Sequence, residues 1–292
     1  MNIRILVIII MLGPAFFVPC EAADYAVARI STPVLNTADF KAVFGGVGGK
    51  DLKTDRCGQV RELEFIALPG SVFKILKKHR SGDTDICLVE TDEYIAPPNV
   101  RLYVDGRFLA QTHDVPLPRS PIKPPREQIL SALRFSAGSS YVWGGNVMAG
   151  IPELVSWYYG GVRPADKAQL TLVGLDCSGL LYNATGGWAP RNTTQLTSYG
   201  RGIKIAGKQP AEIASLLRPL DLIVWNGHVI IVLDRLTAIE SRLKCDMPGN
   251  GGVVMTSLTQ RLAEIMRTRR PEDAWVVGKR RQDAFVVRRW HD

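Results

Sequence analysis

The chain has 292 residues and a formal net charge of +8, and its mean hydropathy is +0.03. Apolar residues make up 46% of it, which is typical of a globular protein and excludes both a polar disordered chain and a bundle of membrane spans. The length suffices for one large or two ordinary domains. The basic excess favours anionic surroundings, such as a cell-wall polymer, a phospholipid surface or a nucleic acid.

Residues 1–23 have the pattern of a secretory signal peptide. Arg4 precedes an apolar run over residues 5–12, and residues 20–23 (CEAA) end in small residues that suit cleavage. The run is too short and too interrupted for a stable membrane span. We therefore expect export to the periplasm or cell envelope, with lipid attachment at Cys20 as the less favoured alternative. Export argues against nucleic acid as a partner, and the chain carries no nucleic-acid-binding motif.

Residues 24–112 have the pattern of a small all-β barrel domain, because short apolar runs are separated by turn residues. The predicted strands include residues 60–68, 72–76, 86–89 and 101–104. The next segment, residues 113–126, contains five prolines, which favour an extended connection. We place the domain boundary in this linker.

Residues 127–292 predict an α+β domain. Two apolar β runs flank Asn226-Gly227, which is the strongest short-range signal for a tight hairpin. The segment 147–173 has no clear periodicity, and we expect it to wall the site. The other expected elements are helices at residues 127–136 and 259–269, a turn and helix from residue 190, and strands at 238–241, 252–255, 274–277 and 285–287.

Cys177 opens a predicted helix within residues 174–182 (GLDCSGLLY). A thiol in the first turn of a helix lies near unpaired N–H groups and the positive end of the helix dipole, and both favour the thiolate. Cys177 is therefore the candidate nucleophile. The alternative is a small buried hydrophobic residue.

A cysteine nucleophile needs a base, and His228 is the one histidine at a defined place in the C-terminal half, at the head of a hairpin strand. The base in turn needs a polar partner on its other ring nitrogen. We expect Glu240 on the following strand, with Asp234 as the alternative. The histidines and cysteines lack zinc-ligand spacing, so we expect no metal and no cofactor.

Four cysteines remain after removal of the signal peptide, and export exposes them to oxidising conditions. Cys57 and Cys87 both lie in the N-terminal half and could form a disulfide, although the sequence leaves the pairing open. If Cys177 stays free as the nucleophile, this pairing leaves Cys245 unpaired or buried.

Five motifs occur in the order found in the NlpC-type cysteine peptidases of bacterial cell-wall metabolism, and the resemblance covers about residues 127–245. The motifs are residues 141–146 (YVWGGN), 175–180 (LDCSGL), 190–193 (PRNT), 221–223 (DLI) and 227–231 (GHVII). Residues 68–76 and 103–109 resemble the bacterial Src-homology-type barrels that accompany such enzymes. The resemblance implies a papain-like catalytic domain, in which the cysteine helix packs on an antiparallel sheet, preceded by a small barrel.

The resemblance also implies roles for individual residues. Cys177 would be the nucleophile, His228 the base and Glu240 the third polar group, a position at which this family often has histidine. The other implied contacts are Tyr141, which would stabilise the oxyanion, and Asp176 and Ser178, which would contact the stem peptide.

The implied function is that of a monomeric, exported peptidoglycan hydrolase that acts on peptidoglycan or muropeptides. It would cleave an amide bond of the stem peptide, with the γ-D-glutamyl-diamino acid bond preferred, because relatives with a barrel recognise a free amino terminus. Two alternatives stay open. One is an N-acetylmuramoyl-L-alanine amidase with the same site. The other is a non-catalytic cell-wall-binding protein, against which the combination of Cys177, His228, Tyr141 and Glu240 argues.

Overall fold

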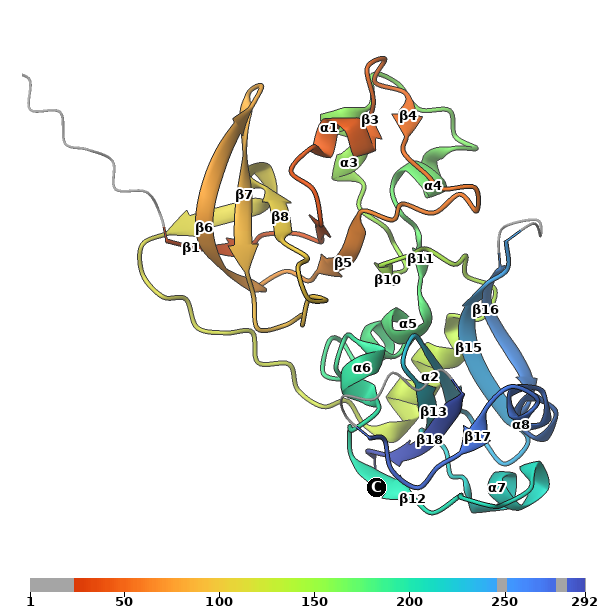
Figure 1. Ribbon diagram of the computed structural model, residues 1–292. Coiled ribbons are helices and arrows are strands. Elements are labelled where there is room, and N and C mark those ends of the chain that lie inside the picture. The colour runs from red at the N-terminus through yellow and green to blue at the C-terminus, as the bar shows by residue number, and fades with distance from the viewer. Residues whose placement is uncertain (1–23, 246–250, 277–282, 292) are drawn as a thin grey trace, which may run out of the picture.

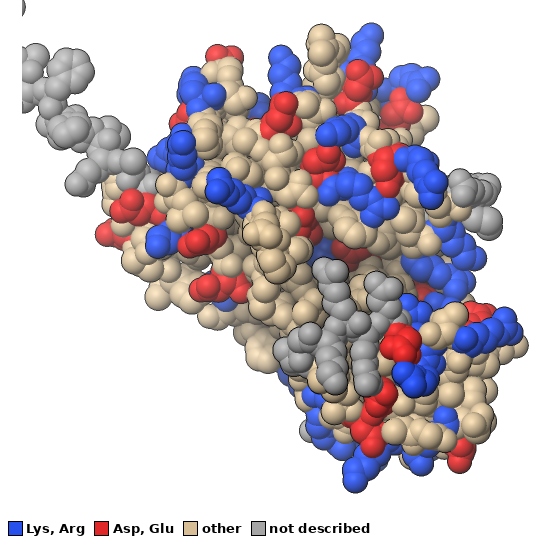
Figure 2. All heavy atoms as spheres, viewed as in Figure 1, with Lys and Arg blue, Asp and Glu red and all other residues tan. Residues whose placement is uncertain are grey.

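The computed structural model of the protein describes residues 24–245, 251–276 and 283–291, and it is a mixed fold of antiparallel sheets with few helices (Figure 1). Each half of the chain builds one seven-stranded sheet. The predicted signal peptide and Cys20 lie outside the described residues, in which no helix has the length and hydropathy to span a membrane. Basic and acidic side chains are interspersed over the face shown in Figure 2.

The N-terminal sheet forms where short apolar runs alternate with turns. Fully buried Phe65, Phe73 and Phe108 fill its core. Its strands are β1 (Tyr25–Ala28), β2 (Thr32–Leu35), β5 (Leu63–Ala67), β6 (Val72–Ser81), β7 (Thr84–Glu90), β8 (Leu102–Asp105) and β9 (Leu109–Thr112), with α1 (Phe40–Val43), η1 (Gly106–Phe108) and the small ladder β3 (Phe44–Gly45) and β4 (Asp51–Leu52) beside them. The strand order is β5-β2-β8-β7-β6-β1-β9.

This sheet curls around its core, but its hydrogen bonding does not close into the expected barrel within the described residues, since β5 and β9 are its edges. Asn146 from the second half covers the edge at β5. Its side-chain amide accepts a hydrogen bond from the N–H of Ile66 at 3.0 Å and donates one to the Ile66 carbonyl at 2.8 Å. A side chain thus takes the place of a neighbouring strand and satisfies an edge that would otherwise be open.

The C-terminal sheet has helices on both faces. Its helices are α2 (Arg126–Phe135), α5 (Cys177–Ala184) and α6 (Thr193–Leu196) on one face and α7 (Pro210–Leu216) and α8 (Leu258–Met266) on the other. Its strands are β12 (Arg201–Ile203), β13 (Leu222–Trp225), β14 (His228–Val232), β15 (Thr237–Leu243), β16 (Gly251–Ser257), β17 (Arg270–Pro271) and β18 (Ala284–Arg289). Leu222 and Val224 lie in the core with α5, whereas Ile223 and Trp225 lie in the core with α8, as the alternation of side chains along a strand requires.

Most of the predicted elements of this half are confirmed. The hairpin at Asn226-Gly227 closes with Trp225 paired to His228. The helices predicted at 127–136 and 259–269 correspond to α2 and α8, and the strands predicted at 238–241, 252–255 and 285–287 lie within β15, β16 and β18.

One predicted strand is wrong. Residues 274–276 form no strand, and Val277 lies outside the described residues. The Asp273 carboxylate accepts hydrogen bonds from the backbone N–H groups of residues 205–206 at 2.7 and 2.8 Å, which draws the segment away from the sheet. Trp275 packs against the cores on both faces instead of entering a ladder.

The segment 147–173 completes the N-terminal core, so the expectation that it walls the site is wrong. It contains α3 (Glu153–Tyr158) and α4 (Lys167–Leu170) and is bracketed by the paired strands β10 (Asn146–Val147) and β11 (Gly174–Leu175). Trp157 packs edge-on against Phe108 with ring centroids 4.5 Å apart, and Tyr158 donates a hydrogen bond to the buried Asp105.

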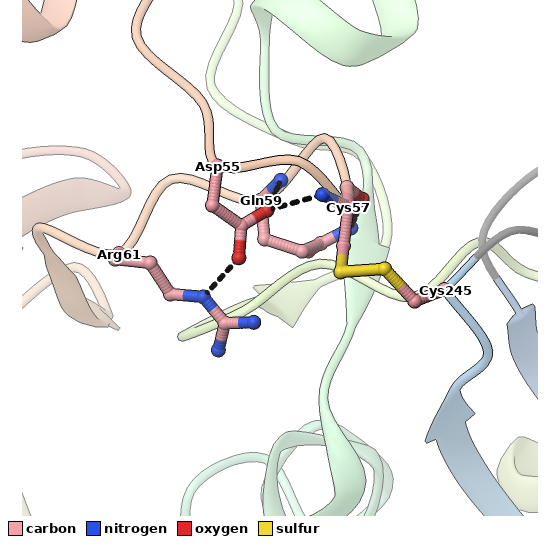
Figure 3. The surroundings of a disulfide bond; sticks show 5 residues. All are labelled: Asp55, Cys57, Gln59, Arg61 and Cys245. Carbon is pink, nitrogen blue, oxygen red and sulfur yellow. Dashed lines mark hydrogen bonds and ion pairs between the residues drawn. A yellow bond between two sulfur atoms is a disulfide. The ribbon is translucent and has the colours of Figure 1, made fainter.

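A disulfide between Cys57 and Cys245 joins the two halves (Figure 3). The two Cα atoms are 5.0 Å apart, although 188 residues separate them in the sequence. The suggested Cys57–Cys87 pairing is therefore wrong, as is the expectation that Cys245 is unpaired or buried, because it is disulfide-bonded and partly exposed. Cys87 is free and fully buried on β7, where burial raises the pKa of its thiol to about 11, whereas Cys57 lies in a loop that reaches the end of β15.

We expect this disulfide to contribute about 2–4 kcal/mol to the free energy of unfolding, because it restricts the unfolded chain. Replacing both cysteines (Cys57→Ser with Cys245→Ser) should lower the guanidinium midpoint of unfolding, monitored by tryptophan fluorescence. A reducing agent should lower the midpoint of the parent protein to the same value and leave the double variant unchanged. Equal midpoints for parent and double variant would contradict the prediction.

Candidate active site

Cys177 is the first residue of α5, and the residues around it define where this helix begins. Asp176 caps the helix, since its Oδ1 accepts a hydrogen bond from the N–H of Gly179 at 2.6 Å. The first turn lies directly on the backbone of Gly145, because a Cβ at position 179 would stand 2.0 Å from the Gly145 carbonyl oxygen. Asp176 and Gly179, the first and last residues of the Asp-Cys-Ser-Gly motif, are thus constrained by their places at the helix start.

Cys177 is 9% exposed, and its Sγ lies 3.8 Å from the carbonyl oxygen of Gly227, the residue before β14. Burial and the negative charge of Asp176 raise its pKa to about 12, against the opposing effects of Arg191 and of nearby backbone N–H groups. The expected preference for the thiolate is therefore outweighed by burial. Cys177 is a thiol at neutral pH and needs a base to react.

His228 opens β14 immediately after Gly227, so its backbone adjoins the sulfur. Its Nε2 lies 2.7 Å from Oε2 of Glu240 on β15, and its ring centroid lies 5.1 Å from that of Trp225. The alternative partner, Asp234, instead accepts hydrogen bonds from backbone N–H groups of its own turn. Because the carboxylate occupies Nε2, Nδ1 is the ring nitrogen left for proton exchange with a reactant.

Two arginines contact the far side of Glu240, and nothing in the sequence pattern identified them. Glu240 is fully buried, and Arg261 of α8 donates to Oε1 from Nε at 2.7 Å and to Oε2 from Nη2 at 3.0 Å. Arg242 lies 3.5 Å from Oε1. Burial alone would raise the pKa of Glu240, but the hydrogen bonds and charges of His228 and Arg261 lower it below its ordinary value.

A buried ion pair supports the cysteine turn. Arg191 is 3% exposed and donates to Oδ2 of Asp176 at 2.6 Å, to Oγ of Ser178 at 2.8 Å and to Oδ1 of Asn146 at 3.0 Å. Asp176 and Ser178, which we expected to contact the stem peptide, line the pocket but are also engaged by Arg191. The sequence motif Pro-Arg-Asn-Thr includes Arg191, but it gave no indication that Arg191 pairs with Asp176.

The pocket at Cys177 has a volume of about 210 Å³ and is lined from both halves of the chain. Larger cavities of about 540 and 310 Å³ lie on the N-terminal sheet and beside Tyr141, and Cys177 lines neither. The thiol pocket is lined by Glu64, Tyr94, Pro97, Tyr141, Trp143, Gly144, Asp176, Cys177, Ser178, Arg191, Asn192, Thr193 and Gly227. Burial, with the charges of Asp176 and Cys177, raises the pKa of the Tyr141 hydroxyl, which keeps it a hydrogen-bond donor.

Glu64 and Tyr94 form the N-terminal wall of this pocket, and neither was predicted. Oε1 of Glu64 accepts a hydrogen bond from Nδ2 of Asn36, and Oε2 accepts one from the hydroxyl of Tyr94, both at 2.8 Å. Tyr94 itself stacks on Phe65 with ring centroids 4.6 Å apart. No lysine or arginine pairs with Glu64 in the part of the chain that the structure describes, so its carboxylate gives the pocket a negative wall.

Within the same described ranges, no three histidine, cysteine, aspartate or glutamate side chains are grouped to hold a metal ion.

Comparisons with known proteins find a distant likeness among solved structures. No protein-family model matches the sequence, and no curated protein matches it. Among solved structures, one match is an NlpC/P60 family protein from Bacillus cereus ATCC 10987, with 14% sequence identity and a TM-score of 0.32. The match covers 92% of this chain and 63% of that chain, so this chain spans less than two thirds of its length.

We expect Asp176→Asn to speed alkylation of Cys177 by iodoacetamide at pH 8 about 10-fold, because it removes the negative charge that opposes the thiolate. Asparagine is as good a helix cap as aspartate, and its Oδ1 can still accept hydrogen bonds from Gly179 and Arg191. Because the variant loses the charge that pairs with the buried Arg191, circular dichroism and the unfolding midpoint are compared with the parent to show that the site is retained. The rate is measured by mass spectrometry of the peptide that contains Cys177. Asp92→Asn, an exposed substitution of the same kind outside the pocket, should leave the rate unchanged, and equal rates for the two variants would contradict the prediction.

Proposed function

We propose that this protein is an exported cysteine peptidase of the bacterial cell wall that hydrolyses an amide bond in the stem peptide of peptidoglycan. The observation that carries the proposal is the pocket in which Cys177 lies beside Gly227, directly before the start of β14, where His228 bonds to Glu240. The ordered motifs that resemble the NlpC-type peptidases support it. On this proposal a Src-homology-type domain precedes a papain-like domain over residues 127–292, from which the segment 147–173 packs into the core of the preceding domain.

The reaction begins with proton transfer from the thiol. His228 accepts the Cys177 proton at Nδ1 while Sγ bonds to the carbonyl carbon and the carbonyl π electrons move to oxygen. The oxyanion accepts hydrogen bonds from the Tyr141 hydroxyl and from the backbone N–H of Cys177. The imidazolium then protonates the leaving nitrogen, the C–N bond breaks, and a thioester remains.

Water completes the cycle. His228 takes a proton from water at Nδ1, and the water oxygen attacks the thioester carbon. Collapse of this second intermediate breaks the C–S bond, releases the carboxylic acid product and returns the proton to the sulfur of Cys177. Glu240 occupies Nε2 throughout, which holds the ring in one orientation and confines proton exchange to Nδ1.

The negative wall at Glu64 favours a substrate that carries a cationic group. A stem peptide with a free amino terminus places an ammonium group next to the carboxylate, and a pocket of about 210 Å³ suits a short peptide. This supports cleavage of the γ-D-glutamyl-diamino acid bond in such a fragment. The substrate of an N-acetylmuramoyl-L-alanine amidase carries a neutral lactyl group at that place, for which a carboxylate offers no advantage.

Cys177→Ala should abolish cleavage of purified muropeptides, because no other group in the pocket can form the thioester. Mass spectrometry of the products identifies the cleaved bond, and Cys87→Ala, which removes the other free thiol, should retain activity. Full activity of Cys177→Ala would exclude the thiol mechanism. Cleavage between the muramoyl group and L-alanine would identify the amidase, and binding to sacculi without cleavage would identify a binding protein.

Glu64→Gln should raise the KM for a muropeptide with a free amino terminus about 10-fold, with little change in kcat, because it removes a charge-assisted contact. The KM for the same peptide with an acetylated amino terminus should not change. Glu90→Gln removes an exposed carboxylate of the same half that does not line the thiol pocket, and it serves as the matched control. An equal rise in KM for both peptides would rule out recognition of the amine by Glu64.

A further inference from the structure

The surroundings of Glu240 differ from those of a lone carboxylate behind a catalytic histidine. The register of β13, β14 and β15 places Glu240 on the side of the sheet that faces α8. There the guanidinium of Arg261 donates one hydrogen bond to each carboxylate oxygen, at 2.7 and 3.0 Å, and Nε2 of His228 lies 2.7 Å from Oε2. The carboxylate is thus held from both sides.

Arg261 is itself fixed on its outer side. Its Nη1 donates to Oε2 of Glu264, one turn further along α8, at 2.9 Å. Three of its nitrogen atoms therefore bond to carboxylates, and the guanidinium plane has little freedom to turn. A side chain so held can determine the rotamer of the fully buried Glu240.

The charges around this carboxylate nearly offset one another. The titratable and charged groups that face it are His228 on β14, Arg242 on β15, and Arg261 with its partner Glu264 on α8; beyond them, Arg269 stacks on Trp225 at 4.5 Å. An unpaired buried carboxylate would strongly stabilise the protonated imidazole of His228. A positive charge on the other side of the carboxylate weakens this stabilisation. A base that must give its proton to a leaving nitrogen does so more easily when its protonated form is less strongly stabilised.

We propose that Arg261 is a positioning residue for the reaction: it aims the Glu240 carboxylate at Nε2 of His228 and limits how strongly that carboxylate retains the imidazolium. This inference rests on the proposed thiol mechanism, in which His228 takes up and releases a proton in each half of the cycle.

The first test needs no substrate. In Cys177→Ala protein, NMR of labelled histidine follows the titration of His228, and adding Arg261→Met should move it to higher pH by about one pH unit, because a positive charge is lost beside the carboxylate. Arg267→Gln removes an exposed arginine at the end of the same helix without contact to Glu240, and it should leave the titration unchanged. Equal titrations for Arg261→Met and Arg267→Gln would overturn the inference.

The second test uses the protein with Cys177 present and a muropeptide as substrate. Arg261→Met should lower kcat about 10-fold or more while KM stays within about two-fold, because the residue acts on the base and not on substrate binding. Arg261→Lys keeps the charge and is expected to fold, but it lacks the fork. It should titrate like the parent and lose part of the turnover, and full turnover in this variant would overturn the positioning role.

The two tests separate this inference from the proposed function. If the parent protein cleaves no muropeptide, the proposed function fails, and the histidine titration alone decides the role of Arg261. If the parent is active and both Arg261 variants match Arg267→Gln in kcat and in titration, the proposed function stands and the inference fails.

Discussion

The ion pair between Arg191 and Asp176 is the interaction on which the site depends. A guanidinium removed from water costs several kcal/mol unless its donors are satisfied. Here the donors reach Asp176, Ser178 and the amide oxygen of Asn146. Asn146 in turn bonds to both backbone groups of Ile66. The start of the cysteine helix, the segment that carries Arg191 and the edge of the N-terminal sheet must therefore assemble together, because none of them satisfies its polar groups alone.

This coupling explains why the pocket draws on both halves of the chain. Glu64 and Ile66 belong to the same short strand, so the bonds from Asn146 to Ile66 also set the place of the Glu64 carboxylate relative to the thiol. The loop before that strand is fixed as well, because Gln59 accepts the N–H of Trp143 at 2.8 Å and the guanidinium of Arg61 lies 4.3 Å from the Trp143 ring. On the proposed function, the carboxylate that would recognise one end of the substrate is thereby held in register with the thiol that would attack it.

Local signals in the sequence predicted most of the elements, and contacts distant in sequence accounted for what was missed. The Asn226-Gly227 hairpin, α2 and the approach of Glu240 to His228 follow from turn chemistry and side-chain periodicity over a few residues. The disulfide across 188 residues leaves no local trace. Arg261 and Glu64 look like ordinary surface residues in sequence, and their partners become visible only once strands and helices are brought together. The apolar residues at 274–276 matched a strand, but an acceptor at Asp273 overrode that preference.

The buried thiol of Cys177 and the charge-balanced carboxylate of Glu240 are both consistent with a mechanism in which the histidine takes up the thiol proton during attack. With the pKa of Cys177 raised to about 12, the thiolate is not preformed in the free protein, so on the proposed mechanism proton transfer to His228 accompanies attack on the carbonyl. A base in that role must accept a proton readily and also release it to the leaving nitrogen. Glu240 alone, fully buried, would favour retention of the proton. The guanidinium of Arg261 on its other side reduces that preference, so the same carboxylate orients the imidazole without trapping its charge.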